Sequence, residues 1–364
     1  MKVVVLGGCG DMALVAVNLL NNEADVEELC IADINYEKAK KLASERAPKA
    51  TAAKIDAMKP ETITELVKDY DVALGFVGPF YMFEKKIANA CIEAGTNYVS
   101  IMDDYDAYLE VIQLDEKAKQ AGVTCICGLG NSPGITNILA KKGYLSMDEP
   151  EKINISWTGG SDEDIGPANI KHVLHIFSGT TLQWKNGHEV RVKTGTARKI
   201  VEFPAPINKV PVYYTGHAES VSVPRNLKGL KEVTLHGGAH PAYISRLAIL
   251  VGKLGLTNTP KKRERLANFF TPIEKAGVFS KGGVDKSVFR IDAYGKKDGK
   301  PVHHYYTGVG HIAEITSIPC VEAALMMARG ELKNPGIHAA ESALEPDDFL
   351  PRLEKRGVVL NYYE

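Results

Sequence analysis

The sequence predicts an α/β protein in which an N-terminal doubly wound parallel sheet is joined to an α+β domain with a largely antiparallel sheet. Three observations predict this division. Short apolar strand patterns alternate with helical patterns over the first 145 residues, which is typical of parallel β-α units. A glycine-rich turn follows the first strand pattern. Beyond residue 145, alternating strand patterns and hairpin signals replace the β-α alternation.

The first domain is expected to contain six strands and their connecting helices. Strand patterns cover residues 3–6, 29–32, 52–55, 72–77, 98–101 and 124–127, and helical patterns cover residues 11–22, 36–47, 84–94 and 105–121, with a further helix opened by Pro60. Ligands of doubly wound sheets bind at the carboxyl ends of the strands. We therefore expect functional residues in the segments 7–13, 33–35, 77–80, 102–104 and 129–137.

The turn after the first strand has the spacing Gly8-x-Gly10-x-x-Ala13, which matches the dinucleotide fingerprint of a Rossmann domain in its G-x-G-x-x-A form. Gly8 allows the tight turn, Gly10 lets a pyrophosphate approach the backbone, and Ala13 lets the helix pack close to the strand. The phosphates would bind free N–H groups at the helix N-terminus. The residues expected to contact the cofactor here are Gly8, Cys9, Gly10, Asp11 and Met12.

An acidic residue, Asp33, ends the second strand at the distance from the glycines that the fingerprint requires. A carboxylate at this position can accept hydrogen bonds from both ribose hydroxyls, and it repels a 2′-phosphate. Ile34 follows, where an NADP site often carries an arginine. The sequence therefore favours NAD as the cofactor, with NADP as the alternative.

Two other strand ends carry candidate site residues. Gly78, Pro79 and Phe80 follow the fourth strand, where such a turn often passes beside the nicotinamide, and apolar side chains there would shield a hydride path from water. Asp103 and Asp104 follow the fifth strand, where a carboxylate could bind an ammonium group or relay a proton. Capping of the following helix is the alternative role, and one aspartate could serve each purpose.

The second domain is expected to span residues 146–311. Strand patterns cover residues 152–158, 210–223 and 231–235, helical patterns cover residues 167–177, 241–254 and 260–276, and hairpins are expected at 183–203, around Asn186-Gly187, and at 287–308. The apolar helical pattern at 312–330 is expected to return to the first domain. That domain would then comprise residues 1–145 and about 312–364.

All ten histidines lie beyond residue 171, so histidine proton chemistry must come from the second domain. The most polar conspicuous stretch of that domain contains His217 and Glu219, which could handle protons, and Arg225, which suits a bidentate grip on a carboxylate. Solvated surface charge is the alternative interpretation. His172 and His175 lie three residues apart on a predicted helix, and we interpret them as solvated helix residues.

Composition argues against several classes of function. The net charge of −1 gives no electrostatic case for nucleic acid or an acidic membrane surface. No apolar run approaches the ~20 residues that a membrane span needs, and the N-terminus shows no signal peptide. The six cysteines lie mostly in apolar settings that suit reduced thiols, so we expect a cytoplasmic protein. No metal site is predicted, because the adjacent His303 and His304 point to opposite faces of a strand.

Together these segments resemble the saccharopine dehydrogenase family, in particular its lysine 6-dehydrogenase-like members. The similarity covers nearly the whole chain and rests on the fingerprint, on G-P-F-Y at 78–81, N-Y-V-S-I-M-D-D at 97–104, G-L-G-N-S-P-G-I-T-N at 128–137, T-G-H-A-E-S-V-S-V-P-R at 215–225 and P-G-I-H-A-A-E at 335–341. The resemblance implies a split architecture, with the substrate domain inserted before the last helices, and a homodimer. Ala218 departs from the pattern, since many relatives place proline there.

The resemblance also implies hydride transfer between NAD(P) and a carbon that bears nitrogen, in an amino acid or opine-type substrate. The residues expected to take the proton of the substrate amine are Asp103, Asp104 and His217, and those expected to bind the substrate are Asn131, Glu219 and Arg225. Two alternatives stay open. One is a reductase of another carbonyl, imine or alkene, and the other is a non-catalytic regulator that binds a dinucleotide.

Overall fold

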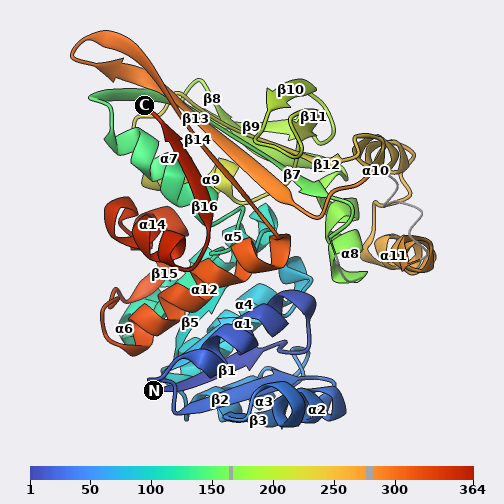
Figure 1. The fold of residues 1–364 in the computed structure, drawn as a ribbon, viewed down its shortest axis with the longest axis vertical. Helices are drawn as coiled ribbons and strands as arrows, with labels where there is room; N and C mark the ends of the chain where they lie inside the picture. Colours follow the sequence, from blue (N-terminus) through green and yellow to red (C-terminus); the bar gives the residue numbers. More distant parts are fainter. Residues whose placement is uncertain (164–166, 276–281) are drawn as a thin grey trace. The chain divides into compact units, whose positions relative to one another are not determined.

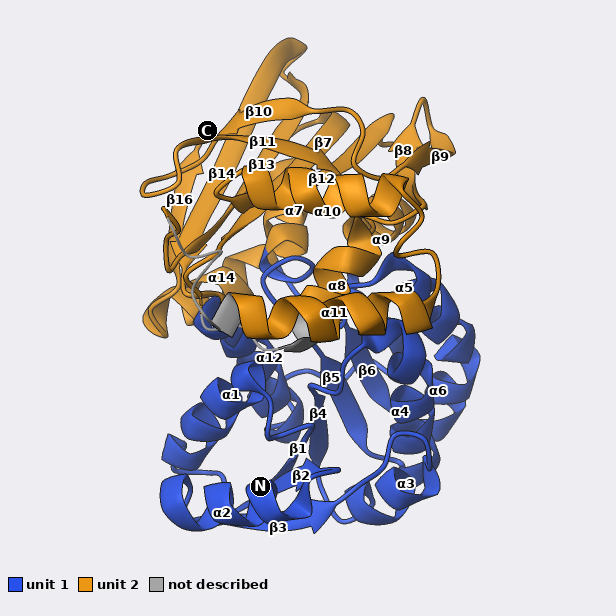
Figure 2. Cartoon of the chain, turned by 90° about the vertical axis from the view of Figure 1, so that its right-hand side faces the viewer, with its two compact units in different colours: residues 1–135, 313–345 blue, residues 136–312, 346–364 orange. Residues whose placement is uncertain are grey.

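A parallel sheet forms the centre of the first of two units in the computed structural model of the chain (Figure 1). The structure describes residues 1–163, 167–275 and 282–364. Unit 1 comprises Met1–Ile135 and Ala313–Glu345, and unit 2 comprises Thr136–Ile312 and Pro346–Glu364 (Figure 2). The chain therefore passes from one unit to the other three times.

The described residues of unit 1 contain seven strands, all parallel, in the order β15-β6-β5-β4-β1-β2-β3. The strands are β1 (Lys2–Leu6), β2 (Glu28–Asp33), β3 (Ala50–Lys54), β4 (Val72–Gly75), β5 (Asn97–Ser100), β6 (Thr124–Cys127) and β15 (Gly336–His338). The helices are α1 (Asp11–Asn22), α2 (Tyr36–Arg46), α3 (Glu61–Val67), α4 (Phe80–Ala94), α5 (Tyr105–Val111), α6 (Asp115–Ala121), α12 (Ile312–Ala328) and α13 (Ala340–Ala343), with a 3-10 turn, η1 (Ile112–Leu114). The predicted doubly wound sheet is confirmed.

The packing of unit 1 explains why its strands are so apolar. Residues 3–6 of β1 are fully buried, as expected for a parallel strand covered on both faces. Helices α1 and α12 lie side by side (Figures 1 and 2), and the Ser317 hydroxyl of α12 donates to the Met12 carbonyl of α1 at 2.7 Å. At the end of α4, Gly95 adopts the left-handed conformation that is common after the last residue of a helix.

Two helix boundaries in unit 1 differ from the sequence prediction. Helix α4 begins at Phe80 rather than at residue 84, because the Asp104 carboxylate accepts a hydrogen bond from the Tyr81 N–H (3.1 Å) and so supports an earlier first turn. The helix expected at 105–121 is divided by η1 into α5 and α6. The Asp115 side chain at the start of α6 accepts the Ile337 N–H of β15 (2.8 Å), which ties this division to the last strand of the sheet.

Unit 2 is built on a second sheet, and the described part of it has nine strands. They are β7 (Glu149–Gly160), β8 (Thr180–Lys185), β9 (His188–Lys193), β10 (Lys199–Glu202), β11 (Lys209–Tyr214), β12 (Glu232–His240), β13 (Ser287–Lys297), β14 (Lys300–Gly310) and β16 (Val359–Tyr363). The main path is β10-β11-β12-β7-β13-β14-β16, and β8 joins β12 to β9. Only the β12–β7 pair is parallel among these described strands, so the predicted largely antiparallel sheet is confirmed.

Unit 2 also contains six helices among its described residues. They are α7 (Ile135–Leu145), α8 (Pro167–Ile176), α9 (Glu219–Asn226), α10 (Tyr243–Lys253), α11 (Pro260–Lys275) and α14 (Pro346–Lys355). Of these, α9 and α10 pack against β12, and α11 packs on α8. Helix α7 approaches the sheet closely at Gly143, where a Cβ would lie 2.6 Å from the Ala293 Cβ. Across the helices that the structure describes, none combines the length and apolar character needed to cross a membrane.

One predicted strand is wrong. The alternating Ser-Val-Ser-Val sequence led us to extend a strand to residue 223, whereas Glu219–Asn226 forms helix α9. Residues 219–224 are all buried, so both the polar and the apolar members of the alternation face protein. Polar contacts to α7 satisfy this helix, including a 3.1 Å hydrogen bond from the Asn137 amide to the Ser222 hydroxyl. Because this helix is buried on all sides, the alternation of Ser and Val does not indicate a strand here.

The C-terminal segment adds a strand that the sequence did not reveal. Strand β16 pairs with β14 in the antiparallel direction, and the Tyr306 hydroxyl donates to the Glu364 carboxylate at 3.0 Å. The sequence analysis grouped the whole of 312–364 with the first domain, whereas this pairing joins residues 346–364 to unit 2. Residues 313–345 supply β15 and most of α12 to unit 1.

Candidate active site

The glycine turn of unit 1 presents the start of α1 to a ligand. Gly10 is the N-cap of α1, and none of the described side chains caps it. The amides of the first turn therefore lack helical acceptors and are available to an anion. Gly10 is exposed, and a Cβ built on it would meet only the Gly7 carbonyl oxygen, at an ordinary 3.5 Å. This open, uncapped helix start fits a dinucleotide pyrophosphate.

The roles of the other glycines in this turn differ from the prediction. The turn itself belongs to Gly7, whose φ is +79° and whose added Cβ would lie 2.8 Å from the Phe76 carbonyl oxygen. Gly8 is required for packing, because a Cβ there would lie 2.7 Å from the Ile31 Cγ2 of β2. Ala13 is fully buried, in line with its predicted packing role. Gly7, which is not part of the G-x-G-x-x-A pattern, is therefore also required by the structure of this turn.

Asp33 lies at the carboxyl end of β2, beside the same turn. Its Oδ2 accepts the Cys9 N–H (3.1 Å) and its Oδ1 accepts the Asn35 N–H (2.9 Å). The Lys38 ammonium donates to the Cys9 carbonyl at 2.8 Å. Each carboxylate oxygen can accept a second hydrogen bond, so Asp33 can still bind ribose hydroxyls. Burial, together with the Asp33 charge, raises the pKa of the Cys9 thiol to about 12, so this cysteine stays neutral.

The structure separates the two aspartates after β5. Asp104 is buried (1 % exposed) and its carboxylate accepts the Tyr81 N–H at the start of α4. It therefore caps the helix that follows Gly78 and Pro79, a different helix from the one that the sequence suggested. Asp103 is only partly buried. Of the pair, Asp103 has the exposure that a group reacting with substrate needs.

A third carboxyl group in unit 1, Glu84 of α4, was not anticipated. It is 1 % exposed, and its oxygens accept hydrogen bonds from the Ser100 hydroxyl (2.6 Å) and the Tyr98 hydroxyl (3.2 Å). Burial raises the pKa of Glu84 to about 7, although these hydrogen bonds oppose the change. Glu84 therefore exchanges a proton near neutral pH, one helix turn from the segment that Asp104 caps.

Phe80 and Asn131 lie on the other segments predicted from strand ends. Pro79 and Phe80 are partly buried at the start of α4, and Gly78 is exposed. Asn131 is 6 % exposed, and its Oδ1 has no hydrogen-bond partner within residues 1–163, 167–275 and 282–364. A buried amide oxygen of this kind is available to a ligand donor. Cys127 is buried and its pKa is raised well above its usual value by burial, which makes it a poor nucleophile.

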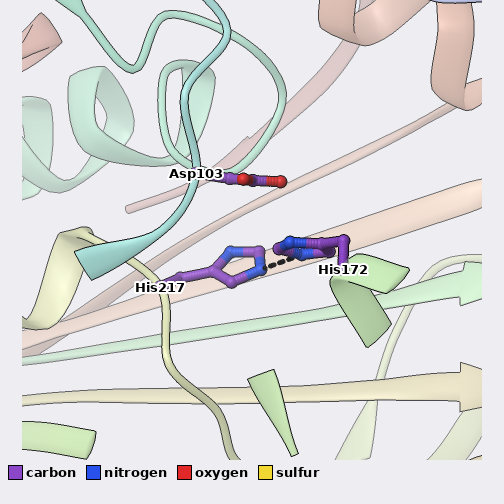
Figure 3. A group of neighbouring side chains, drawn as sticks. All are labelled: Asp103, His172 and His217. Atoms are coloured by element: carbon purple, nitrogen blue, oxygen red, sulfur yellow. Dashed lines mark hydrogen bonds between the residues drawn. The ribbon is translucent and has the colours of Figure 1, made fainter. Parts of the chain in front are cut away.

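In unit 2, His217 lies in a cluster of side chains from several segments. Its ring stacks on the Trp157 ring of β7, with centroids 4.8 Å apart. Its Nε2 lies 2.9 Å from the Nε2 of His172 on α8, a hydrogen bond between two imidazoles (Figure 3). Its Nδ1 lies 3.9 Å from Glu219 Oε2. His217 is 4 % exposed, so it is a buried imidazole rather than surface charge.

Glu219 begins α9 and is fully buried. Its Oε1 accepts a hydrogen bond from the Thr136 hydroxyl of α7 at 3.2 Å. Gly237 of β12 makes room for the cluster, because a Cβ there would lie 2.4 Å from the Trp157 ring and 3.0 Å from the Thr215 methyl group. A carboxyl group and an imidazole are side chains that can exchange protons in an enzyme site. The arrangement can therefore hold and move a proton.

Arg225 lies at the opposite end of α9 from Glu219. Its Nη2 is 2.8 Å from Glu189 Oε1 of β9, and about a third of each side chain is exposed. Its Nη1 is buried and has no hydrogen-bond partner in the described part of the chain. One side of the guanidinium is thus occupied by Glu189. No hydrogen bond among the described residues joins Arg225 to the His217 cluster.

Sequence reasoning missed three members of the unit 2 cluster: Trp157, Thr136 and His172. His172 was interpreted as solvated, but it is partly buried and bonded to His217. Its spacing from His175 gave a weak signal, because residues three apart share a helix face. Trp157 lies within the strand predicted at 152–158, and no sequence pattern related it to His217.

Comparison with protein families covers almost the whole chain. The model described as the saccharopine dehydrogenase NADP binding domain matches residues 3–126. The model described as the saccharopine dehydrogenase C-terminal domain matches residues 130–358. Both findings confirm the resemblance drawn from the sequence.

Two curated relatives match almost the whole chain. Carboxyaminopropylagmatine dehydrogenase of Synechocystis sp. is 23% identical over 98% of this chain and 96% of its own length. Carboxynorspermidine synthase of Vibrio cholerae serotype O1 is 24% identical over 96% of this chain and 89% of its own length.

Two solved structures share the fold at low sequence identity. Apo saccharopine dehydrogenase (L-Glu forming) from Saccharomyces cerevisiae superposes with a TM-score of 0.69 at 17% identity, over all of both chains. Amine dehydrogenase from Mycobacterium smegmatis gives a TM-score of 0.53 at 12% identity, over 94% of this chain and 96% of its own. Because the family models together reach from residue 3 to residue 358, the chain belongs to the saccharopine dehydrogenase family and is an NAD(P)-dependent oxidoreductase that acts on a C–N bond.

Proposed function

We propose that the substrate is an amino acid or opine-type compound in which the reacting C–N bond lies next to a carboxylate. The observation that carries this proposal is the buried pair of Glu219 and His217, with 3.9 Å between Oε2 and Nδ1. Such a pair suits a substrate whose nitrogen gains or loses a proton during the reaction. The names of the two bacterial relatives, carboxyaminopropylagmatine dehydrogenase and carboxynorspermidine synthase, both describe carboxylated amines.

Bound NAD(P) supplies the hydride acceptor or donor. We propose that the turn formed by Gly8, Cys9, Gly10, Asp11 and Met12 holds the pyrophosphate and that Gly78, Pro79 and Phe80 border the nicotinamide. We also propose NAD as the preferred cofactor. Asp33 supports this preference, because its negative charge accepts ribose hydroxyls and repels a 2′-phosphate. The open helix start at Gly10 supports the pyrophosphate assignment.

The proton-handling groups of this proposal are Asp103 in unit 1 and His217 in unit 2. Asp103 is preferred to Asp104, since Asp104 is buried and engaged with the Tyr81 N–H. The amine must be unprotonated before hydride leaves its carbon, so a base is required in the oxidative direction. Arg225 and Asn131 are proposed to bind the substrate, and the Arg225 Nη1, which has no hydrogen-bond partner among the described residues, supports a role toward a carboxylate.

The test is the absorbance of the reduced nicotinamide. The purified chain is mixed with NAD or NADP and a panel of lysine, saccharopine, other opines and carboxylated polyamines. In the reverse direction, reduced cofactor is mixed with diamines and carboxylate-bearing aldehydes or keto acids. Turnover of one carboxylated amine is the expected result. Turnover confined to carbonyl or alkene compounds without an amine would instead support a reductase of another substrate class.

Two further properties belong to this proposal. A homodimer is supported by aromatic pairs of the unit 2 sheet that are at least partly exposed, where Tyr305 stacks on Tyr363 and Tyr294 stacks on His303. Aromatic side chains are enriched at protein interfaces. A cytoplasmic location is supported by the six buried free thiols. Sedimentation velocity and cell fractionation test these two properties.

A further inference from the structure

Glu84 of α4 lies where three strands of the unit 1 sheet end. Its two carboxyl oxygens accept hydrogen bonds from the Ser100 hydroxyl (2.6 Å) and the Tyr98 hydroxyl (3.2 Å) of β5. The Cys127 thiol at the end of β6 makes a further hydrogen bond with it. Gly75, the last residue of β4, leaves room for this network, because a Cβ there would overlap the Tyr98 hydroxyl. Glu84 is therefore bonded to β5 and β6 at their carboxyl ends and, through Tyr98, adjoins the end of β4.

These strand ends lead into the segments that the proposed function assigns to the cofactor. The segment 78–80 follows β4, and its last residue lies four positions before Glu84 on α4, which is roughly 6 Å along a helix axis and on the same side of the helix. The Ser100 carbonyl accepts the Gly128 and Leu129 N–H groups (3.1 and 2.7 Å), which holds the turn after β6 to the end of β5. Glu84 thus lies about one helix turn from the segment proposed to border the nicotinamide.

The charge of Glu84 can change near neutral pH. Burial raises its pKa to about 7, and because the side chain is only 1 % exposed, water screens its charge weakly. The other titratable groups that interact with it are Tyr98, Asp104 and the thiols of Cys91, Cys125, Cys127 and Cys320. Burial raises the pKa of the tyrosine and of each of these thiols. Between pH 6 and pH 8.5 these hydroxyl and thiol groups stay neutral, whereas Glu84 loses its proton.

The two redox states of the cofactor differ in charge at the nicotinamide. The ring of NAD carries a positive charge, and the ring of NADH is neutral. A carboxylate near the ring attracts the oxidised form, and a neutral carboxyl group does not. The pyrophosphate, the riboses and the adenine are common to both forms. The charge near the ring therefore acts on the ratio of the two affinities.

We propose that Glu84 is a specificity-determining residue that controls the preference of the cofactor site for NAD relative to NADH. This inference rests on the proposed function, which places the nicotinamide beside residues 78–80. When Glu84 loses its proton, its buried negative charge stabilises the cationic ring, and NAD binds more tightly relative to NADH. When Glu84 holds its proton, this contribution is absent. The preference for oxidised cofactor therefore increases as pH rises through about 7.

The ratio of two dissociation constants tests this role. Fluorescence titration measures the Kd of NADH, and displacement of NADH measures the Kd of NAD, at several values from pH 6 to pH 8.5. In the unmodified protein the ratio of Kd for NAD to Kd for NADH should fall about tenfold over this range, the order expected for one weakly screened charge. Glu84→Gln keeps the shape but cannot ionise, so its ratio should stay at the low-pH value. The inference is overturned if the unmodified ratio is constant, or if Glu84→Gln follows the same profile.

Ser100→Ala provides a second variant. The Ser100 hydroxyl lowers the pKa of Glu84, so its removal should move the midpoint of the profile to higher pH. Thr96→Val is the matched control, because it removes another buried hydrogen bond, to the Val67 carbonyl (2.7 Å), beyond the opposite end of α4. Its midpoint should stay in place. A midpoint that moves in neither variant, or equally in both, overturns the assignment of the profile to Glu84.

Gly10→Ala separates a failure of this inference from a failure of the proposed function. Because the pyrophosphate is common to both redox states, this substitution should weaken NAD and NADH equally and leave their ratio unchanged at each pH. If neither affinity responds to Gly10→Ala, the proposed cofactor site fails, and the inference fails with it. If both affinities respond but the ratio in the unmodified protein is independent of pH, the cofactor site stands and only the inference is overturned.

Discussion

Units 1 and 2 build their candidate sites in different ways. The site residues of unit 1 lie in turns at the ends of neighbouring parallel strands, and backbone groups carry much of the geometry, as at Gly10 and Asp33. The cluster of unit 2 is assembled from side chains on β7, α7, α8 and the start of α9. A site built on backbone turns tolerates few substitutions, whereas a site built from side chains depends on their packing.

The largest expected effect concerns the buried carboxyl group of unit 1. The pKa of Glu84 is about 7 in the folded chain and 4.5 in its ordinary state. Because the folded state holds the proton more tightly, Glu84 lowers the free energy of unfolding progressively as pH rises from about 4.5 to 7. Glu84→Gln removes this dependence. Relative to the unmodified protein, the variant should gain roughly 3 kcal/mol between pH 4.5 and pH 8.

Urea unfolding at several pH values measures this difference. Glu93→Gln serves as a control, since Glu93 is partly exposed and pairs with Lys117 at the surface. Parallel stability curves for Glu84→Gln and the unmodified protein would show that Glu84 is ionised at neutral pH, and would contradict this prediction.

The second prediction tests whether the glycine turn binds the cofactor through its backbone. Gly10→Ala should fold normally, because its Cβ has room, but the added methyl group would obstruct the pyrophosphate. Cofactor affinity should fall roughly 100-fold, near the upper end of the 1–3 kcal/mol that overpacking costs. Gly8→Ala should instead lower stability, since its Cβ meets Ile31. Fluorescence titration with NADH and thermal melting distinguish the two, and unchanged affinity in Gly10→Ala would refute the assignment.

The third prediction concerns a side chain of unit 2. If Arg225 anchors a substrate carboxylate, Arg225→Ala should raise KM about 10- to 100-fold, the value of a charged hydrogen bond. Glu189→Ala breaks the same surface ion pair but leaves the guanidinium in place, so its KM should change less than about twofold. Equal and small effects of the two substitutions on KM would leave Arg225 with a structural role only.

The smallest expected effect concerns the choice between NAD and NADP. Asp33→Asn keeps the shape of the side chain and removes its charge. The ratio of NADPH to NADH affinity should rise about tenfold, because the repulsion of a 2′-phosphate is lost and hydrogen bonds to the ribose weaken. Glu37→Gln, an exposed carboxylate on α2, is the control. A ratio that does not move in Asp33→Asn would assign cofactor preference to other residues.

The sequence predicted unit 1 better than unit 2 for a physical reason. The ends of α1 and β6 agree with their predicted ranges, because the glycine turn and the apolar runs act locally. The same local reasoning failed at α9, where tertiary burial overrides the alternation of Ser and Val. It also missed His172, because no local pattern tells which face of α8 meets a residue 45 positions later. Asp33 could be named from its distance to the glycines, and His217 and Glu219 from the polar stretch that contains them, but their partners required the fold.

The pairing of β15 with β6 and of β16 with β14 has a consequence for synthesis of the chain. A nascent chain that has reached residue 330 contains six of the seven described strands of the first sheet. It still lacks β15, which covers the outer edge of β6. The second sheet is completed later still, because its edge at β14 is covered only when residues 359–363 emerge. Exposed strand edges promote association between chains. Both sheets therefore depend on the last tenth of translation, and chains truncated there should be prone to aggregate.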